Sequence, residues 1–165
     1  TIVYYLWACR APLQCFKRTL SKKMIWFTKP NVEEFNNRPK NHIGGLLDIK
    51  FTEIGKDFLK GTMPVDDRTR QPYGILHGGA SVVLTETLGS VASNLVIDTN
   101  FKMGVGLEVN ANHLRPIKSG LVTGICTPIH IGGKTHVWDI KLYNDKGKIT
   151  CISRLTIAVV PVIKL

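Results

Sequence analysis

Several recognisable features are missing from this sequence, and each absence narrows the possibilities. Its apolar start, residues 2–8, has seven residues, far fewer than the roughly 20 that a membrane-spanning helix needs. The same segment lacks the charged-then-apolar order of a secretory signal. No G-x-S-x-G turn, Walker loop or H-E-x-x-H helix is present. Most interpretations that involve a nucleophilic triad are therefore removed.

Cysteine and histidine are too scattered to indicate a disulfide framework or a metal site. The four cysteines show no C-x-x-C spacing, and Cys126 and Cys151 fall in apparent strands as small apolar residues. We therefore expect reduced thiols and a cytoplasmic protein. Three histidines lie on different segments without a local ligand spacing, so no metal ion is expected: His113, His130 and His136.

Positive charge is in excess, and its distribution suggests a basic extension before a single domain. The net charge is +10, from 22 basic and 12 acidic residues. Residues 1–23 hold five of the basic residues and no acid, so the remaining chain carries only +5. That modest excess suits a phosphorylated ligand and argues weakly for nucleic acid. We expect one domain at 24–165, with 1–23 as non-native, upstream-translated or disordered sequence, or alternatively a basic presequence or membrane-surface tether.

The most informative stretch of the chain runs from residue 71 to residue 90. Beyond its His-Gly-Gly sequence, apolar residues recur at helical spacing with no proline before Asn100, at Leu84, Leu88, Val91 and Leu95. This pattern predicts a mostly buried helix over 78–97. At 1.5 Å per residue the helix would be roughly 30 Å long, enough to cross a small domain, so we expect the rest of the chain to wrap it.

A polar stripe interrupts the apolar pattern of this helix. Glu86 stands near its middle, where a carboxylate is costly without a partner or a task, and Ser90 and Ser93 follow on the same side. One interpretation of this polar stripe is that it simply faces water. The other interpretation is that the stripe belongs to a functional site, because Gly78 and Gly79 leave the first amides of the helix uncovered. Free N–H groups at the positive end of a helix dipole can bind an anion or a developing oxyanion.

Glu86 and Gly78 lie too far apart to act together within one chain. They are separated by eight residues, which is about 12 Å along a helix and beyond the reach of a glutamate side chain. If two copies pack their helices antiparallel about a two-fold axis near Val82, residue 78 of one faces residue 86 of the other. This arrangement predicts a homodimer with two composite sites, which Val82 would help to line.

Strand patterns lie on both sides of the long helix. Before it we expect a short helix at 31–35 and a hairpin formed by 47–51 and 58–63. After it come four runs with a period of two residues, joined by short turns: 103–113, 121–131, 134–142 and 149–159. Short connections between consecutive strands indicate an antiparallel sheet. The predicted fold class is α+β, with a curved antiparallel sheet wrapped around one long central helix.

The residues near the start of the helix suit attack on a carbonyl group. Amides at Gly78 and Gly79 would hold the oxyanion, and Glu86 would activate water or attack directly. Further hydrogen-bonding groups are available at Gln71, His77 and Ser90. A thioester fits this set because its thiolate leaves without strong acid assistance, whereas an amide would require more help than these residues offer.

The same stretch resembles a known enzyme family. Residues 63–90, with a glutamate nine residues after the histidine of His-Gly-Gly, are similar to the hotdog-fold acyl-CoA thioesterases of the 4-hydroxybenzoyl-CoA-thioesterase-like subgroup. Segments 106–115 and 151–156 continue the match, which covers about residues 24–160. The resemblance implies a hotdog fold and hydrolysis of an aryl-CoA or acyl-CoA thioester. It also implies a dimer of dimers, with the glutamate and the glycine on different subunits, as the spacing predicts.

The resemblance assigns a role to each residue of the predicted site. It implies that Glu86 is the nucleophile or general base and that the Gly78 amide polarises the thioester carbonyl. Gln71 and His77 would orient the carbonyl or the water, and Ser90 would assist the hydrolytic water.

The resemblance also implies substrate contacts at the surface. Tyr73 occupies the place of an aromatic residue near the acyl pocket, with core packing as the plain alternative. Gly79 is expected to bind the substrate at the start of the helix. Contacts to CoA are implied for the surface residues His113, Arg115, His130, Gly133 and Lys134; solvated strand ends are the alternative for the charged ones. Gly133 replaces a common serine and Lys134 a common arginine, and lysine cannot make the bidentate phosphate contact of arginine. The preference between CoA and a carrier protein therefore stays open.

The resemblance, together with these residues, leaves three functions open. The leading one is hydrolysis of 1,4-dihydroxy-2-naphthoyl-CoA in menaquinone synthesis, and the second is proofreading of misloaded aryl carrier proteins. A non-catalytic acyl-CoA-binding domain is the alternative from another class, although Glu86 argues against it. The expected partners are a small-molecule acyl-CoA or an acyl carrier protein, without nucleic acid or a membrane span. No cofactor is expected, since CoA is part of the substrate.

Overall fold

The computed structural model describes residues 24–28, 30–37 and 39–162. The predicted basic extension, residues 1–23, lies outside the described residues, as do the last three residues of the predicted domain. The described elements are α1 (Val32–Asn36), α2 (Ile43–Leu46), β1 (Lys50–Ile54), β2 (Leu59–Pro64), α3 (Gly78–Leu95), β3 (Lys102–His113), β4 (Leu121–Ile131), β5 (Thr135–Tyr143) and β6 (Ile149–Pro161).

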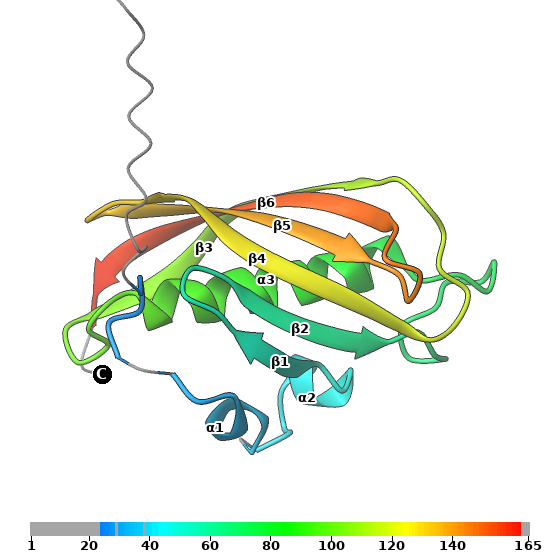
Figure 1. The fold of residues 1–165 in the computed structure, drawn as a ribbon, viewed down its shortest axis with the longest axis horizontal. Coiled ribbons are helices and arrows are strands. Elements are labelled where there is room, and N and C mark those ends of the chain that lie inside the picture. The colour runs from blue at the N-terminus through cyan, green and yellow to red at the C-terminus, as the bar shows by residue number, and fades with distance from the viewer. Residues whose placement is uncertain (1–23, 29, 38, 163–165) are drawn as a thin grey trace, which may run out of the picture.

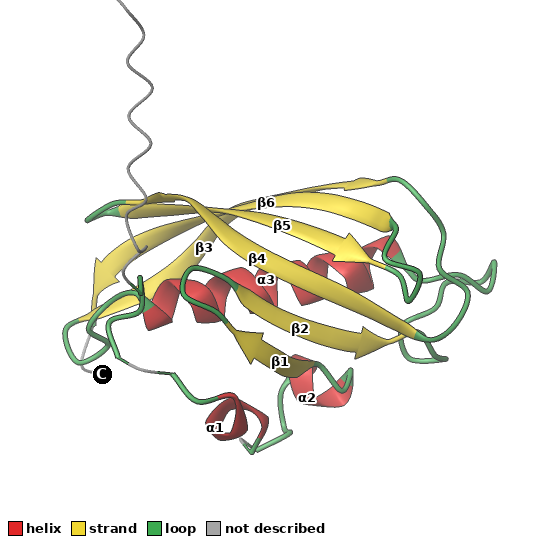
Figure 2. Cartoon of the chain, in the orientation of Figure 1, coloured by secondary structure: helices red, strands yellow, loops and turns green. Residues whose placement is uncertain are grey.

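A six-stranded antiparallel sheet curves around helix α3 (Figures 1 and 2). The strand order is β1-β2-β4-β5-β6-β3, so strand β3, which follows the helix directly, lies at one edge and pairs with β6. This architecture is the predicted α+β hotdog fold. Strand β3 has no neighbour on its outer side within the described chain.

The core lies between α3 and the concave face of the sheet. Leu84, Leu88 and Ala92 have no exposed surface, and they recur at the spacing that places them on one helix face. Two strand glycines allow this face to approach closely: a Cβ at Gly124 would lie 2.5 Å from Leu88 Cδ1, and one at Gly61 would lie 3.0 Å from Leu88 Cδ2. Full burial of each leucine contributes about 1.5–3 kcal/mol.

The first part of the chain differs from the prediction. The alternation of apolar residues at 47, 49 and 51 predicts a strand from residue 47, but β1 begins at Lys50 and a short helix, α2, precedes it. The His42 side chain accepts a hydrogen bond from Gly45 N–H and caps α2, and Asp48 turns the chain with φ 52°. The alternation alone cannot reveal this turn, because a single helical turn leaves too short a pattern.

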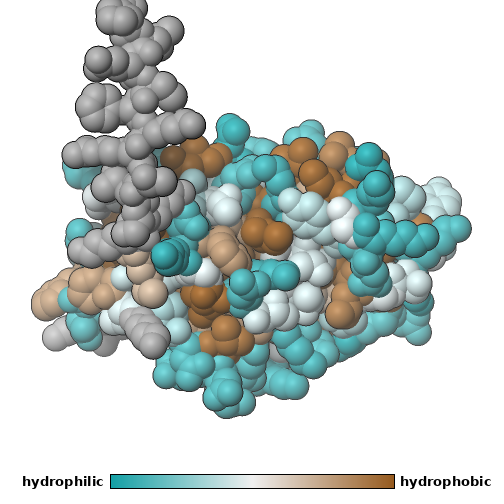
Figure 3. Space-filling model, in the orientation of Figure 1, coloured by the Kyte–Doolittle hydropathy of each residue, from teal (hydrophilic) through white to brown (hydrophobic). Residues whose placement is uncertain are grey.

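The surface of the molecule is mixed in polarity. On the face shown in Figure 3, apolar side chains form separate patches among polar ones. Within the described residues, no helix is both long enough and apolar enough to cross a membrane.

Candidate active site

Gly78 N–H is a free backbone donor at the start of helix α3. His77 is the N-cap residue, and its Nδ1 accepts a hydrogen bond of 2.8 Å from Gly79 N–H. Among the described residues no acceptor is found for Gly78 N–H. The sequence predicts a donor pair at Gly78 and Gly79, but the histidine cap occupies the second amide. A carbonyl oxygen approaching the positive end of this helix therefore meets the Gly78 amide.

A cavity of about 400 Å³ opens at this end of the helix. Three of the other predicted site residues line it together with Gly78: Gln71, His113 and Arg115. His113, at the end of β3, packs against the helix start, since a Cβ at Gly78 would lie 2.9 Å from His113 Nε2. Arg115 Nη1 donates a 2.6 Å hydrogen bond to the Ile149 carbonyl, which fixes the guanidinium at the cavity edge.

A tight turn holds Gln71 at the cavity. Gln71 N–H donates to the Ile75 carbonyl and Gly74 N–H to the Gln71 carbonyl, each at 2.9 Å. Gly74 has φ 73°, a left-handed conformation that glycine adopts without strain. Tyr73 stands at the tip of this turn and is 87% exposed, so core packing within the described chain does not account for it.

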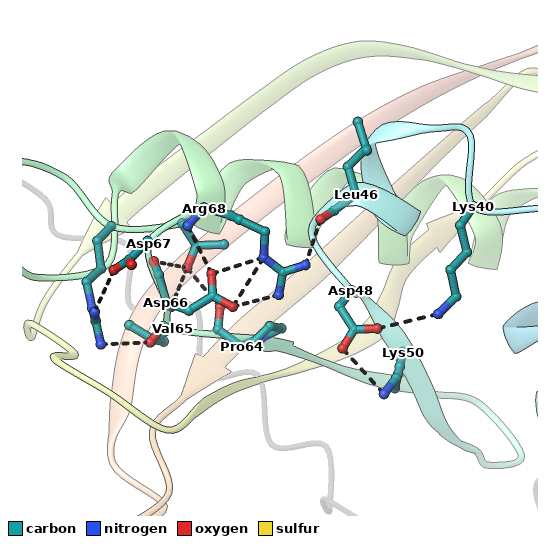
Figure 4. Close-up of polar contacts among 11 residues, drawn as sticks. Lys40, Leu46, Asp48, Lys50, Pro64, Val65, Asp66, Asp67 and Arg68 are labelled. Carbon is teal, nitrogen blue, oxygen red and sulfur yellow. Dashed lines mark hydrogen bonds and ion pairs between the residues drawn. The ribbon is translucent and has the colours of Figure 1, made fainter.

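The loop that leads into this turn is attached to helix α2 (Figure 4). Arg68 Nη2 lies 2.6 Å from Asp66 Oδ2, and Arg68 Nη1 donates a 2.8 Å hydrogen bond to the Leu46 carbonyl. The hydrogen bond from Arg68 holds the pKa of the Asp66 carboxyl below its usual value. Because these groups are solvent-exposed, they contribute little to stability. Their effect is to fix the path of the chain just before Gln71.

Glu86 and Ser90 lie away from this cavity. Glu86 is exposed, and its Oε1 would lie only 3.2 Å from a Cβ at Gly106, so the glycine of β3 leaves room for the carboxylate. Ser90 lines a second cavity, of about 490 Å³, between α3 and the segment that contains Phe27 and Phe35. Within one chain, the predicted carboxylate and the predicted oxyanion donor therefore lie apart, in agreement with the spacing argument.

The predicted CoA contacts are also divided between the two ends of α3. Gly133 lines a cavity of about 590 Å³ together with residues that follow the helix, among them Phe101 and Lys102. The turn between β4 and β5, which carries His130 and Lys134, lies at the opposite end of the molecule from the loop before α3 (Figure 1). Within one chain this turn does not meet His113 and Arg115. Val82, half-buried on α3, lies between the two ends.

Two features of the helix were not anticipated from the sequence. Asn94 connects α3 to β3: its Nδ2 donates to the Ser90 carbonyl at 2.9 Å, and its Oδ1 accepts from Gly104 N–H at 3.0 Å. An asparagine one turn after Ser90 is the signal that could have indicated this contact. Ser93 was expected on the polar stripe but is fully buried, where it bonds to His136 and Trp138 of β5.

Neither described cysteine is activated, and the described residues form no metal-binding group. Burial raises the pKa of the Cys126 thiol well above its usual range and raises that of Cys151, so neither is an activated nucleophile. In the part of the chain that the structure describes, no group of three or more histidine, cysteine or acidic side chains is placed to hold a metal ion.

Comparisons with known proteins identify relatives of this chain. Residues 73–151 match the thioesterase superfamily. The chain is 56% identical over 137 residues to the putative esterase PA1618 of Pseudomonas aeruginosa, covering 83% of this chain and 94% of that protein. A crystal structure of a mutant of thioesterase PA1618 matches with a TM-score of 0.82 and 55% identity, covering 84% of this chain and 99% of that one.

Two further relatives have more specific names. One is the 1,4-dihydroxy-2-naphthoyl-CoA hydrolase of Escherichia coli, 50% identical over 136 residues, covering 82% of this chain and 99% of that protein. The other is the proofreading thioesterase EntH of Cronobacter turicensis, 43% identical over 136 residues, covering 82% and 98%.

Proposed function

Because this chain belongs to the thioesterase superfamily, we propose that it hydrolyses 1,4-dihydroxy-2-naphthoyl-CoA to the free acid and CoA, as a step of menaquinone synthesis in the cytoplasm. The observation that carries the reaction type is the free Gly78 amide at the start of α3, inside a cavity that Gln71 and His113 also line. The choice of acyl group rests on the relative that is 50% identical and carries this activity in its name.

The proposed site is shared between two subunits. Glu86 is exposed in one chain, and the neighbouring edge strand β3 carries three exposed apolar side chains, Met103, Val105 and Leu107. An unpaired edge strand with apolar side chains is a liability in a monomer, whereas a second copy would cover it. An antiparallel pair of α3 helices brings Gly78 of one subunit opposite Glu86 of the other. The proposed assembly is this homodimer, further paired as a dimer of dimers.

The reaction follows from these placements. The thioester carbonyl oxygen accepts a hydrogen bond from Gly78 N–H, and the helix dipole stabilises the negative charge that develops there. Nδ1 of His77 is used by the helix cap, so its other ring nitrogen, together with Gln71, is available to orient the carbonyl or the water. Glu86 of the partner subunit either removes a proton from water or attacks the carbonyl carbon itself. The C–S bond then breaks, the thiolate of CoA leaves, and water supplies the oxygen of the free acid.

The remaining substrate contacts lie at the surface and require no cofactor. His113 and Arg115 at the cavity edge, and the turn that carries His130, Gly133 and Lys134, are proposed to contact the phosphates of CoA. Ser90, one turn beyond Glu86, would bond to the hydrolytic water. A second candidate function is proofreading of a misloaded aryl carrier protein. It is favoured by the 43% identity to EntH and by the absence of an arginine from the proposed phosphate turn.

Release of free thiol from a panel of thioesters tests the proposal. The panel contains 1,4-dihydroxy-2-naphthoyl-CoA, benzoyl-CoA, a fatty acyl-CoA and an aryl carrier protein loaded with benzoate. Glu86→Gln and Glu86→Ala should each lower kcat by two or more orders of magnitude, whereas Glu53→Gln, an exposed glutamate on β1, should not. If no thioester is cleaved, or if the Glu86 variants match the native chain, the catalytic function is wrong and a binding domain takes its place.

A further inference from the structure

Three side chains form a buried hydrogen-bonded chain between α3 and the sheet. Ser93 and Trp138 have no exposed surface, and His136 is 1% exposed. Trp138 Nε1 donates to Ser93 Oγ at 2.6 Å, and the same oxygen lies 3.2 Å from His136 Nδ1. The imidazole and indole rings pack edge to face with their centroids 6.4 Å apart. Nothing in the proposed reaction uses this cluster.

The partners fix the direction of the hydrogen bonds. An indole nitrogen can only donate, so Ser93 Oγ accepts from Trp138 and its own hydrogen is free to bond to His136 Nδ1. The neutral imidazole then carries its proton on Nε2. His136 pairs with Ile131 across the base of the turn between β4 and β5, and it lines the same cavity as Gly132 and Gly133. The chain of donors therefore runs from Trp138 through Ser93 to His136, which stands beside the turn.

Gly132 belongs to the turn between β4 and β5. Residues 130–134, called here the phosphate turn, include three of the residues proposed to meet the CoA phosphates, His130, Gly133 and Lys134. A Cβ at Gly132 would lie 2.5 Å from His130 Nε2, so the His130 ring packs against the turn, and His136 pairs with Ile131 at its base. The strand hydrogen bonds at the base of the turn are Gly132 N–H to Thr135 carbonyl and Val159 N–H to Lys134 carbonyl, each 2.9 Å.

We propose that His136 is a positioning residue, which ties the phosphate turn to helix α3 through Ser93 so that the turn is held ready for the phosphates of CoA. The inference rests on the proposed function, because it assumes that the turn meets CoA. The same helix carries Glu86 seven residues before Ser93, so one rigid element fixes both the carboxylate and the turn. Buried hydrogen bonds of this kind, between a helix and a strand, give such rigidity.

The test compares two thioesters of the same acyl group, one of CoA and one of N-acetylcysteamine, which lacks the pantetheine phosphates and the nucleotide. His136→Leu removes the hydrogen bond to Ser93, and Ser93→Ala removes the hydrogen bonds to both His136 and Trp138. For the CoA thioester we expect KM to rise about ten-fold with kcat within about two-fold of native, because charge-assisted contacts are weakened while the reacting groups stay in place. For the N-acetylcysteamine thioester we expect KM and kcat within about two-fold of native.

Two further variants separate positioning from packing. In His136→Gln the amide oxygen can still accept from Ser93, so KM for the CoA thioester should return to within about three-fold of native. The matched control is Ser153→Ala, which removes another buried hydroxyl, one that donates to the Asn110 carbonyl at 2.6 Å. This variant should lower the melting temperature without changing the ratio of the two KM values.

The outcomes are distinguishable. A rise of KM confined to the CoA thioester supports the positioning role. An equal rise for both thioesters, or no rise for either, would overturn it while leaving the thioesterase function intact. Cleavage of neither thioester by the native chain would overturn the proposed function and this inference with it.

Discussion

Replacing Gly78 with proline would remove one hydrogen-bond donor from the proposed site and leave helix α3 in place. Gly78 is the first residue of the helix, a position where the backbone N–H has no intrahelical acceptor and where the fixed φ of proline suits the geometry. The preceding residue, His77, has φ −70° and ψ 135°, an extended conformation of the kind that a following proline favours. The substitution therefore deletes the N–H with little change to the fold.

The size of the effect follows from the role of that amide. Loss of one oxyanion donor lowers kcat by about 10²–10³-fold, which corresponds to about 2.7–4 kcal/mol of transition-state stabilisation. Gly78→Ala is the matched control because it keeps the N–H. Its Cβ would lie 2.9 Å from His113 Nε2, which is the end of a side chain that can rotate away. The alanine variant should therefore lose much less activity than the proline variant.

Steady-state thiol release from the best CoA thioester gives kcat for the native chain and for both variants. Far-UV circular dichroism checks that the helix content is unchanged. If the proline and alanine variants have the same kcat within a factor of about three, the Gly78 amide is not the oxyanion donor. The assignment of the site to the start of α3 would then be refuted.

Two stability predictions follow from buried residues. Burial lowers the pKa of His136, so below an ordinary histidine pKa of about 6.5 the unfolded chain binds the proton more readily. The free energy of unfolding in urea should therefore fall between about pH 7.5 and about pH 5. The fall should be smaller in His136→Gln. An equal pH dependence of the two chains would contradict a neutral buried ring. Leu88→Ala should lower the free energy of unfolding by about 2–5 kcal/mol, because Leu88 is fully buried between α3 and two strand glycines. The control is Leu121→Ala, at a position 44% exposed, which should change the free energy of unfolding by less than about 1 kcal/mol. Similar losses of stability at Leu88 and Leu121 would contradict this account of the core.

The local patterns of the sequence were sufficient for most of the elements. The spacing of Leu84 and Leu88 predicted a helix over 78–97, and α3 spans Gly78–Leu95. The period of two residues predicted a strand over 121–131, which is the observed extent of β4. Both patterns are strong because one face of each element is buried.

The order of the strands could not be predicted in the same way. Strand β3 pairs with β6, whose sequence begins 36 residues after the end of β3, and this pairing leaves β3 at the edge beside Glu86. Alternation identifies which residues face the core but does not identify the neighbouring strand. The burial of Ser93 was missed for a related reason, since its partners, His136 and Trp138, come from a distant strand.

The candidate site was predicted in part. The sequence indicated Gly78, Gln71 and His113, and the structure places all three at one cavity. It did not indicate that the His77 side chain would occupy the Gly79 amide, because this depends on the rotamer of the cap. The catalytic roles and the contribution of a second subunit stay predictions from the spacing and the resemblance.

The most direct test of the shared site mixes two inactive variants, Glu86→Gln and Gly78→Pro, after they are unfolded together in urea and refolded as a 1:1 mixture. In a mixed dimer, one site carries both lesions and the other combines a native Glu86 with a native Gly78. Random pairing makes half of the dimers mixed, so thiol release should recover to about a quarter of the native rate. A rate that stays at the level of the separate variants would contradict the central claim that each site takes its oxyanion donor from one chain and its carboxylate from the other.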